Sequence, residues 1–379
     1  MSLIPCQRAR FEIPEDIHYL NCAYMSPMAD SVRAAMEEGA AFKARPWTFR
    51  PEHFFSLAED YRTAAARMCG AAADDIAIVP SVSYALATAA GILPVAKGQE
   101  ILVLADQFPS NVYPWRALVA ATGARVRTVE KGNRGWTDAV LNAIGERTAI
   151  AALPHCHWAD GGRLDLAAIG EALRKAGASL ALDLTQSLGA LRFDVKDVQP
   201  DFMVAAGYKW LLGPYSLGML YVAPRWQDAA PLEQNWMNRA GSDDFARLVD
   251  YRDDYQPGAR RFDMGEKSNA PQLMAGKAAL NLLESWGVAN IAETLGARTA
   301  ALAEEARRIG LTAQDEPERA PHFLSLGFPD GAPADLPDRL AAENVFVSLR
   351  GQSLRVTPHL WVNDADCERL IAVLRDALG

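Results

Sequence analysis

Short runs of hydrophobic residues occur between residues 76 and 222, and they alternate with segments of helical length. Each run is apolar on both faces, as expected for strands that helices cover on both sides. This alternation predicts an α/β fold with a mostly parallel central sheet. The predicted strands are Ile76–Val79, Ile101–Leu104, Val126–Val129, Ala149–Leu153, Leu180–Leu182, Phe202–Ala205 and Leu217–Val222.

Helical periodicity is found on either side of this region. Apolar side chains recur on one face of residues 52–69, and Gly70 is a fitting end for that helix. Later in the chain, strand-like runs and an amphipathic last segment predict a small α+β lobe. The other predicted helices are Asp30–Arg45, Gln272–Trp286, Ala292–Ile309 and Asp364–Leu378, and the late strands are Phe323–Leu326, Val345–Leu349 and Ser353–Thr357. We therefore expect an N-terminal segment over residues 1–30, a large domain over 31–285 and a small domain over 286–379.

Composition narrows the classes of partner. The 379 residues include 38 Lys and Arg against 47 Asp and Glu, a formal net charge of −9, which argues against nucleic acid as a partner. The longest uncharged stretch, Ile76–Ala96, contains Pro80 and Pro94, so we expect a strand, turn and helix there and no membrane partner. The first ten residues lack an unbroken apolar core, which predicts a cytoplasmic location. The five cysteines have no regular spacing, which argues against a disulfide framework or a zinc ribbon.

The segment from Leu180 to Val222 carries the most specific chemistry. Asp183 ends one predicted strand, and Lys209 comes just after the next one. A carboxylate at the carboxyl end of a parallel strand faces the crevice in which open α/β folds bind ligands. A buried lysine there costs free energy unless it is paired or used covalently. Pyridoxal phosphate chemistry needs both, because a lysine holds the cofactor and an acid keeps its pyridine nitrogen protonated.

This segment resembles the class V aminotransferase group of fold-type I pyridoxal phosphate enzymes, which includes cysteine desulfurases, selenocysteine lyases, kynureninases and isopenicillin N epimerases. The resemblance implies a large cofactor-binding domain, with a mostly parallel sheet between helices, and a small α+β C-terminal domain. It assigns Lys209 as the Schiff-base lysine and Asp183 as the partner of the pyridine nitrogen. It also assigns Gln186 to the ring oxygen of the cofactor and Tyr208 to its phosphate.

The resemblance implies further cofactor contacts. A turn after the first predicted strand opens a helix, where backbone N–H groups and hydroxyls can hold a phosphate dianion; its residues are Ser81, Val82 and Ser83. Phe108 matches the aromatic residue that stacks on the cofactor ring in kynureninase-like members. His157 is the candidate for a polar contact with the cofactor. Because His155 lies two residues before it and Asp160 three after, a structural histidine and a metal ligand stay open as alternatives, and we predict no metal site.

Other family positions concern the dimer and the substrate. Ser268 matches the residue that reaches the phosphate of the other subunit, which implies a homodimer with shared active sites, although the loop Gly265–Asn269 is one residue longer than the usual Gly-Thr-Pro-Asn. Asn21 and Tyr24 fall in the segment that lines the substrate pocket. Arg355 matches the arginine that binds a substrate carboxylate with its planar donors.

The sequence leaves the reaction less defined. Desulfurases carry a nucleophilic cysteine shortly before the arginine strand, but residues 348–354 contain no thiol, Cys22 is at best a pocket-lining residue, and Cys367 falls on the apolar face of the last predicted helix. We therefore predict an aminotransferase acting on an amino acid, with a selenocysteine lyase-like or kynureninase-like lyase or an epimerase as alternatives. From other classes, a non-catalytic α/β binding protein stays open, and a nicotinamide-dependent oxidoreductase lacks a GxGxxG motif after any predicted strand.

Overall fold

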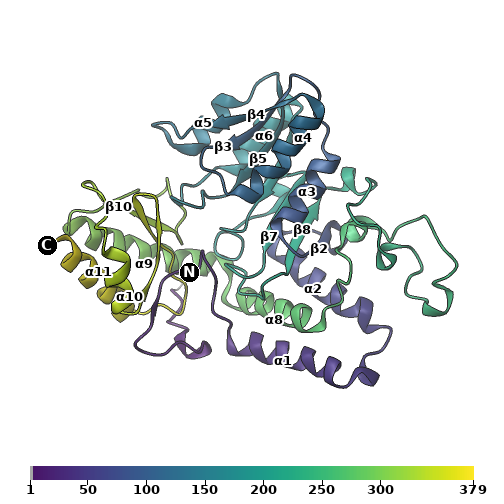
Figure 1. Cartoon of the computed structure of the whole chain (residues 1–379), viewed down its shortest axis with the longest axis horizontal. Helices are drawn as coiled ribbons and strands as arrows, with labels where there is room; N and C mark the ends of the chain where they lie inside the picture. Colours follow the sequence, from purple (N-terminus) through teal and green to yellow (C-terminus); the bar gives the residue numbers. More distant parts are fainter. Residues whose placement is uncertain (1–2) are drawn as a thin grey trace.

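The computed structural model describes residues 3–379 as a large lobe and a smaller C-terminal lobe (Figure 1). A seven-stranded sheet with the order β2-β8-β7-β6-β5-β3-β4 forms the centre of the large lobe. Only β8 is antiparallel to its neighbours, β2 and β7. The predicted α/β fold with a mostly parallel sheet is therefore confirmed. The strands are β2 (Ile76–Val79), β3 (Glu100–Leu104), β4 (Arg125–Val129), β5 (Thr148–Pro154), β6 (Ser179–Asp183), β7 (Phe202–Ala206) and β8 (Gly218–Val222).

Helices cover both faces of this sheet, so alternate strand residues enter two different cores. In β3, Ile101 and Val103 pack in one core with Trp115, whereas Leu102 and Leu104 pack in the other. This alternation follows from the two-residue period of a strand. The helices of the large lobe are α1 (Asp30–Ala44), α2 (His53–Cys69), α3 (Val82–Ile92), α4 (Tyr113–Thr122), α5 (Gly135–Ala143), α6 (Leu166–Ala176), α7 (Val195–Val198) and α8 (Ala270–Trp286).

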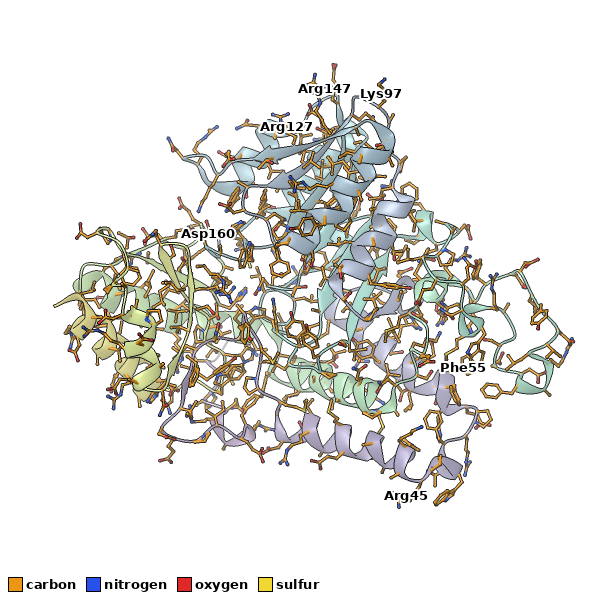
Figure 2. All side chains as sticks on the ribbon, in the orientation of Figure 1. Arg45, Phe55, Lys97, Arg127, Arg147 and Asp160 are labelled. Carbon is orange, nitrogen blue, oxygen red and sulfur yellow. The ribbon has the colours of Figure 1, made fainter. Side chains whose placement is uncertain are left out.

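The edge strand β4 carries arginines that pair with a buried carboxylate. Glu100 is buried at the start of β3, and three arginines surround its carboxylate: Arg125 at 3.7 Å, Arg127 at 3.4 Å and Arg147 at 3.0 Å. Two of them belong to the edge strand β4, and Figure 2 shows Arg127 and Arg147 at the same end of the large lobe. Basic side chains on an edge strand discourage pairing with another chain.

The small lobe contains a four-stranded sheet, β12-β13-β10-β9, packed with α9, α10 and α11. The prediction of one strand over Val345–Leu349 is wrong, because that run divides between two sheets. β11 pairs in parallel with β1 of the N-terminal segment, whereas β12 pairs with β13. The elements are β1 (His18–Tyr19), α9 (Val288–Arg308), β9 (Thr312–Ala313), β10 (Leu324–Gly327), α10 (Leu336–Ala342), β11 (Val345–Phe346), β12 (Ser348–Arg350), β13 (Ser353–Val356) and α11 (Asp364–Leu378).

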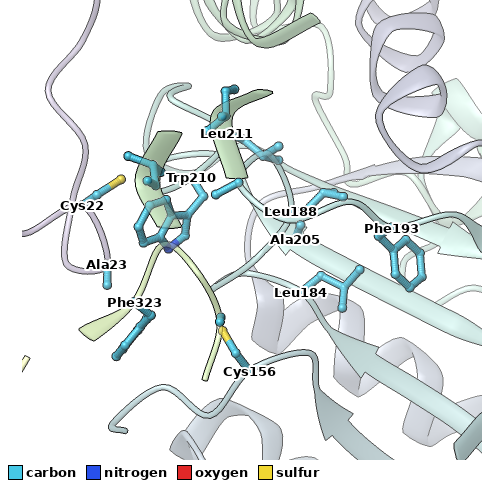
Figure 3. Close-up of a cluster of buried hydrophobic side chains, with 14 of the residues drawn as sticks. Cys22, Ala23, Cys156, Leu184, Leu188, Phe193, Ala205, Trp210, Leu211 and Phe323 are labelled. Atoms are coloured by element: carbon cyan, nitrogen blue, oxygen red, sulfur yellow. The ribbon is translucent and has the colours of Figure 1, made fainter. Parts of the chain in front are cut away.

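The N-terminal segment joins the two lobes beside the ends of the parallel strands. The backbone N–H of Cys22 donates to Thr357 of the small lobe at 2.9 Å, and that of Ser26 donates to Tyr208 of the large lobe at 3.0 Å. Figure 3 shows Cys22, Trp210 and Phe323 in one buried cluster, although they come from three distant parts of the sequence. Within residues 3–379, no helix is both long and apolar enough to cross a bilayer.

Candidate active site

A cavity of about 270 Å³ lies at the carboxyl ends of the parallel strands. The ends of β2, β5, β6 and β7 all reach it, which is where open α/β sheets bind their ligands. The structure brings most of the predicted cofactor residues to its wall: Ser81, Val82, Ser83, Phe108, Asp183, Gln186, Tyr208 and Lys209. Ser81 and Lys209, the first and the last of these residues, are more than 120 positions apart in the sequence. The order of the strands in the sheet brings them to one cavity.

Asp183 is the last residue of β6 and is buried at the bottom of this wall. Its Oδ1 accepts a hydrogen bond from the backbone N–H of Thr185 at 3.0 Å, and the Thr185 hydroxyl in turn accepts from the N–H of Ala206 at 3.1 Å. Burial raises the pKa of Asp183, while the bonds from Thr185 and the charge of Lys209 act in the opposite direction. The carboxylate is thus fixed in position and ready to bind a positively charged or proton-bearing group.

Lys209 lies in a tight turn after β7. Gly207 begins this turn, and a Cβ at that position would lie 2.6 Å from the carbonyl oxygen of Leu217, so a larger residue would displace the backbone. The Lys209 side chain is 7% exposed, and its Nζ lies 5.5 Å from the ring centroid of Phe108 and 5.4 Å from that of Tyr208. Burial lowers the pKa of Lys209 to about 8, even though Asp183 raises it. A substantial fraction of the amine is therefore neutral near pH 8.

The turn between β2 and α3 also lines the cavity. The Ser81 hydroxyl accepts from the N–H of Tyr84 at 3.2 Å as the N-cap of α3, and it lies 3.0 Å from the hydroxyl of Ser83. Unpaired N–H groups and the positive end of the helix dipole gather at such a terminus. The Ser81–Ser83 turn can therefore hold a phosphate group, with the Tyr208 side chain on the same wall.

Aromatic rings form a third side of the cavity. The ring of Phe108 contacts that of Trp158 edge to face, with 5.5 Å between centroids. Trp158 was missed by the sequence reasoning, although it directly follows His157 at the end of the same strand region. Thr185 was also missed, and its place two residues after Asp183 was the available signal. The cavity thus combines aromatic rings, a buried acid and a helix N-terminus that can hold a phosphate, so the residues present fit pyridoxal phosphate.

Gln186 lines the cavity, but its amide is already engaged. Its Nε2 donates to the carbonyl of Ala23 and its Oε1 accepts from Trp210 Nε1, both at 3.1 Å. These bonds tie the N-terminal segment to the turn that carries Lys209. The second N–H of the amide is left for a ligand, so the predicted contact with the ring oxygen of the cofactor stays a prediction.

His157 is not among the residues that line the cavity. Its ring stacks on Trp136 with 5.0 Å between centroids, Nε2 lies 3.1 Å from the carbonyl of Ala105, and Nδ1 lies 3.2 Å from Asp160 Oδ1. Asp160 also binds Lys131 and contacts Gln314, and Figure 2 shows it between the two lobes. This arrangement favours the structural alternative for His157. Within residues 3–379, no three His, Cys, Asp or Glu side chains are grouped as metal ligands.

The predicted substrate residues lie where the N-terminal segment meets β12 and β13. Arg355 is 2% exposed and donates from Nη1 to the carbonyl of Trp158 at 3.1 Å, while its Nε has no partner. Burial lowers the pKa of Arg355 to about 10, and the charge of Arg350 adds to that effect. Asn21 is buried and accepts from the Ser348 hydroxyl at 3.0 Å, whereas Tyr24 is 57% exposed.

Ser268 lies outside this cavity within its own chain. Its hydroxyl donates to the carbonyl of Phe54, and the neighbouring Lys267 is buried with its Nζ 2.6 Å from Asp263 Oδ2. The proposed contact of Ser268 with the phosphate of another subunit therefore stays a prediction. The same holds for the homodimer.

Neither Cys22, which contacts the turn that carries Lys209, nor Cys367 on α11 resembles an activated thiol. Burial raises the pKa of Cys22 well above its ordinary value, and its Sγ lies 3.7 Å from the carbonyl of Lys209. Cys367 is on α11, 3.5 Å from Arg298 Nη1, and burial raises its pKa as well. Neither carries the lowered pKa typical of a nucleophilic cysteine.

Comparison with known proteins identifies a family that matches most of this chain. The model of the family described as aminotransferase class-V matches residues 30–363. An uncharacterized aminotransferase, YcbU of Bacillus subtilis, is 28% identical over 348 residues, which covers 89% of this chain and 88% of the relative. The kynureninase of Deinococcus radiodurans is 30% identical over 293 residues, covering 74% of this chain and 68% of that enzyme.

Solved structures share the fold. A mutant of the cystine C-S lyase C-DES, with glycine covalently linked to its PLP cofactor, superposes with a TM-score of 0.88 at 19% sequence identity. The match covers 98% of this chain and 99% of that one. The fold is therefore fold-type I, as the sequence predicted.

Proposed function

Since this chain belongs to the class V aminotransferase family, whose members depend on pyridoxal phosphate, we propose that it carries the cofactor on Lys209 and transfers the amino group of an amino acid. The observation that carries this proposal is the state of Lys209. It is buried beside Asp183 in a cavity at the carboxyl ends of the strands, and burial lowers its pKa to about 8. A lysine in that state is a nucleophile and a base near neutral pH.

Each wall of the cavity has a role in holding the cofactor. The Ser81–Ser83 turn and Tyr208 would bind the phosphate, Phe108 would cover one face of the ring, and Asp183 would hold the proton on the pyridine nitrogen. When bound, pyridoxal phosphate supplies an electron sink that stabilises negative charge at the substrate α-carbon. The raised pKa of Asp183 reflects its burial, and a cationic partner placed there would keep the carboxylate ionised.

The remaining residues act on the substrate. Arg355 would bind the α-carboxylate through its free guanidinium donors, which fixes the orientation of the bonds at the α-carbon. The Lys209 amine would take the α-proton and return it at another atom. Trp158 and Phe108, whose rings contact each other in the cavity wall, would exclude water from this transfer. Transamination needs only these groups and a second substrate that accepts the amine.

A lyase is the second candidate function. The specific observation in its favour is the similarity to a kynureninase over 74% of the chain. Residues 348–354 contain no thiol, which argues against a thiol-dependent desulfurase as the form of lyase. A lyase would use Lys209, Asp183 and Arg355 in the same roles as an aminotransferase. The two reactions would then differ in whether the substrate side chain carries a leaving group.

One experiment separates the two reactions. Holoenzyme is incubated with individual amino acids, with and without an α-keto acid such as pyruvate or 2-oxoglutarate, and the products are analysed by mass spectrometry. An aminotransferase gives a new amino acid in proportion to the keto acid added. A lyase gives a cleaved side chain and turns over without any acceptor. Acceptor-independent turnover would contradict the transaminase proposal, and no reaction at all with any amino acid would contradict both.

A further inference from the structure

We propose that Arg350 is a second anion-binding residue of the substrate pocket, and that the substrate is an amino acid with a second carboxylate on its side chain. This inference rests on the proposed function, because it assumes that Arg355 binds the α-carboxylate. It begins from the small lobe, where two arginines without carboxylate partners stand on one face of a sheet.

The register of the small sheet places these arginines together. β12 and β13 pair antiparallel, with Ser348 opposite Arg355 and Arg350 opposite Ser353. Residues that face each other, or lie two apart on one strand, project from the same side of a sheet. Arg350 and Arg355 are therefore diagonal neighbours on one face, at the usual spacing of about 7–8 Å. Their companions on this face are the small polar residues Ser348 and Ser353.

Arg350 contacts the wall of the cavity. Its guanidinium carbon lies 5.8 Å from the centroid of the Trp158 ring, and Trp158 contacts Phe108 and accepts the hydrogen bond from Arg355 through its carbonyl. The charge of Arg350 also acts on Lys209, where it is one of the causes that lower the pKa of the amine. Arg350 thus borders the site from the side of the small lobe.

The donors of Arg350 are largely unused. Nη1 donates to the carbonyl of its neighbour Leu349 at 2.8 Å, and Nε is buried with no partner. Across residues 3–379, no carboxylate lies within ion-pair distance of Arg350 or Arg355, whereas the buried arginines Arg62 and Arg319 each have at least one such partner. Leaving guanidinium donors unsatisfied in a partly buried place costs free energy that an anionic ligand would offset.

The charged side chains in and beside the cavity indicate the class of substrate. Lys209, Arg350 and Arg355 are cationic, and Asp183 is the carboxylate that acts on Lys209. In the holoenzyme Asp183 is assigned to the pyridine nitrogen and Lys209 is consumed by the cofactor, which leaves two guanidinium groups for the substrate. One α-carboxylate satisfies Arg355. A carboxylate on the side chain would satisfy Arg350, so we infer an amino dicarboxylic acid.

The test uses ligands without an amine, so that binding is measured apart from turnover. Isothermal titration calorimetry of the holoenzyme gives dissociation constants for glutarate and succinate, which have two carboxylates, and for butyrate, which has one. The proteins are the wild type, Arg350→Gln, Arg350→Lys and the control Arg369→Gln. Arg369 is an exposed arginine of α11 that pairs with Glu343, so its variant removes the same charge far from the site.

We expect the better of the two dicarboxylates to bind the wild type about 10- to 100-fold more tightly than butyrate, as for a charge-assisted hydrogen bond. Arg350→Gln should remove most of that difference and leave butyrate within about twofold, whereas Arg369→Gln should leave both unchanged. Arg350→Lys, which keeps the charge, should lie between them and shows whether loss of charge or misfolding causes the effect. An equal loss for glutarate and butyrate would overturn the proposal, because Arg350 would then assist the α-carboxylate.

The same samples separate this inference from the proposed function. If the wild type takes up no cofactor on Lys209, the proposed function fails whatever the dicarboxylates do. If the cofactor is bound and alanine or another monocarboxylic amino acid changes its absorbance as strongly as aspartate or glutamate, only the role of Arg350 is overturned. Selective response to aspartate or glutamate, lost in Arg350→Gln, supports both.

Discussion

Lys209 and Lys267 are both buried lysines, but their surroundings differ. Lys267 is 1% exposed and lies 2.6 Å from Asp263, which also receives two hydrogen bonds from Arg62, at 3.1 and 2.8 Å, and one from the N–H of Ile78 at 2.7 Å. Lys209 is 7% exposed, and within residues 3–379 no carboxylate lies within ion-pair distance of its amine. One lysine completes a buried charge cluster, and the other faces a cavity.

This difference shows that a buried charged group can either stabilise the fold or become reactive. In the cluster of Arg62, Asp263 and Lys267, hydrogen bonds offset the cost of desolvation, so removing one member leaves a buried charge with fewer partners. At Lys209 the charge of Asp183 offsets only part of the cost, and the remainder appears as a pKa lowered to about 8. Groups of the second kind are those expected in catalysis. The predictions below substitute matched residues in the two regions.

The largest contrast is expected between the two lysines themselves. Lys209→Ala should lower turnover on the order of 10⁴-fold or more, because the covalent and proton-transfer steps depend on one amine, and it should leave folding intact. Lys267→Met should instead destabilise folding, by roughly 3–5 kcal/mol, since Asp263 then lacks one of its partners. Turnover and urea unfolding measured on both variants check this. The comparison breaks down if the two variants show the same pattern.

Substitutions of Asp183 and Asp263 should likewise differ, the first in turnover and the second in stability. Asp183→Asn should retain the cofactor and lower kcat by roughly 10²–10³, about 2.7–4 kcal/mol, because an amide cannot stabilise a protonated pyridine nitrogen. Asp263→Asn should reduce the free energy of unfolding by about 3–5 kcal/mol, because Lys267 loses its counter-charge and Arg62 keeps only Glu59. Cofactor absorbance, kcat and urea unfolding are the measurements. Normal turnover in Asp183→Asn would contradict the role of Asp183 as the partner of the pyridine nitrogen.

A smaller effect is expected at the two buried arginines. Arg355→Lys keeps the charge but replaces a planar pair of donors by a single ammonium, so kcat/KM for the amino acid should fall roughly 10- to 100-fold. Arg62→Lys loses its two-point contact with Asp263 and should lower the unfolding midpoint without changing KM. An unchanged KM in Arg355→Lys is the result that would count against a carboxylate contact.

The smallest expected effect is a shift in pH dependence. The neutral amine reacts with an aldehyde, so the rate at which apoprotein takes up pyridoxal phosphate should rise with pH with a midpoint near 8, since burial lowers the pKa of Lys209 to about 8. Asp183 raises this pKa, so Asp183→Asn should move the midpoint to lower pH. Stopped-flow absorbance over roughly pH 6 to 11 gives the profile. A midpoint near 10 would mean that the amine is solvated.

Much of the fold could be predicted because strands and helices leave periodic patterns. Residues 76–79 and 364–378 have the predicted bounds, and Lys209 and Asp183 were identifiable because both come directly after or at the end of an apolar run. The division of Val345–Leu349 between two sheets was not predictable, since it depends on pairing with His18 and Tyr19 more than 300 positions away.

The site residues that escaped prediction are those set by side-chain direction. Trp158 and His157 are adjacent in sequence, and no local pattern decides which one faces the cavity. The same limit applies to Arg350, whose importance depends on sharing a sheet face with Arg355 and on the absence of a carboxylate beside it in the described chain. Pairing register and three-dimensional charge balance supply this information, and periodicity does not.

The attachment of the cofactor to Lys209 is the most direct test of the account. Holoenzyme is reduced with borohydride, digested and mapped by mass spectrometry, with Lys209→Ala and Lys267→Met treated in parallel. The account predicts a pyridoxyl group on the peptide that contains Gly207, Tyr208, Lys209 and Trp210 in the wild type and in Lys267→Met, and none in Lys209→Ala. A pyridoxyl group on Lys267, Lys131 or Lys175 in the wild type would contradict it.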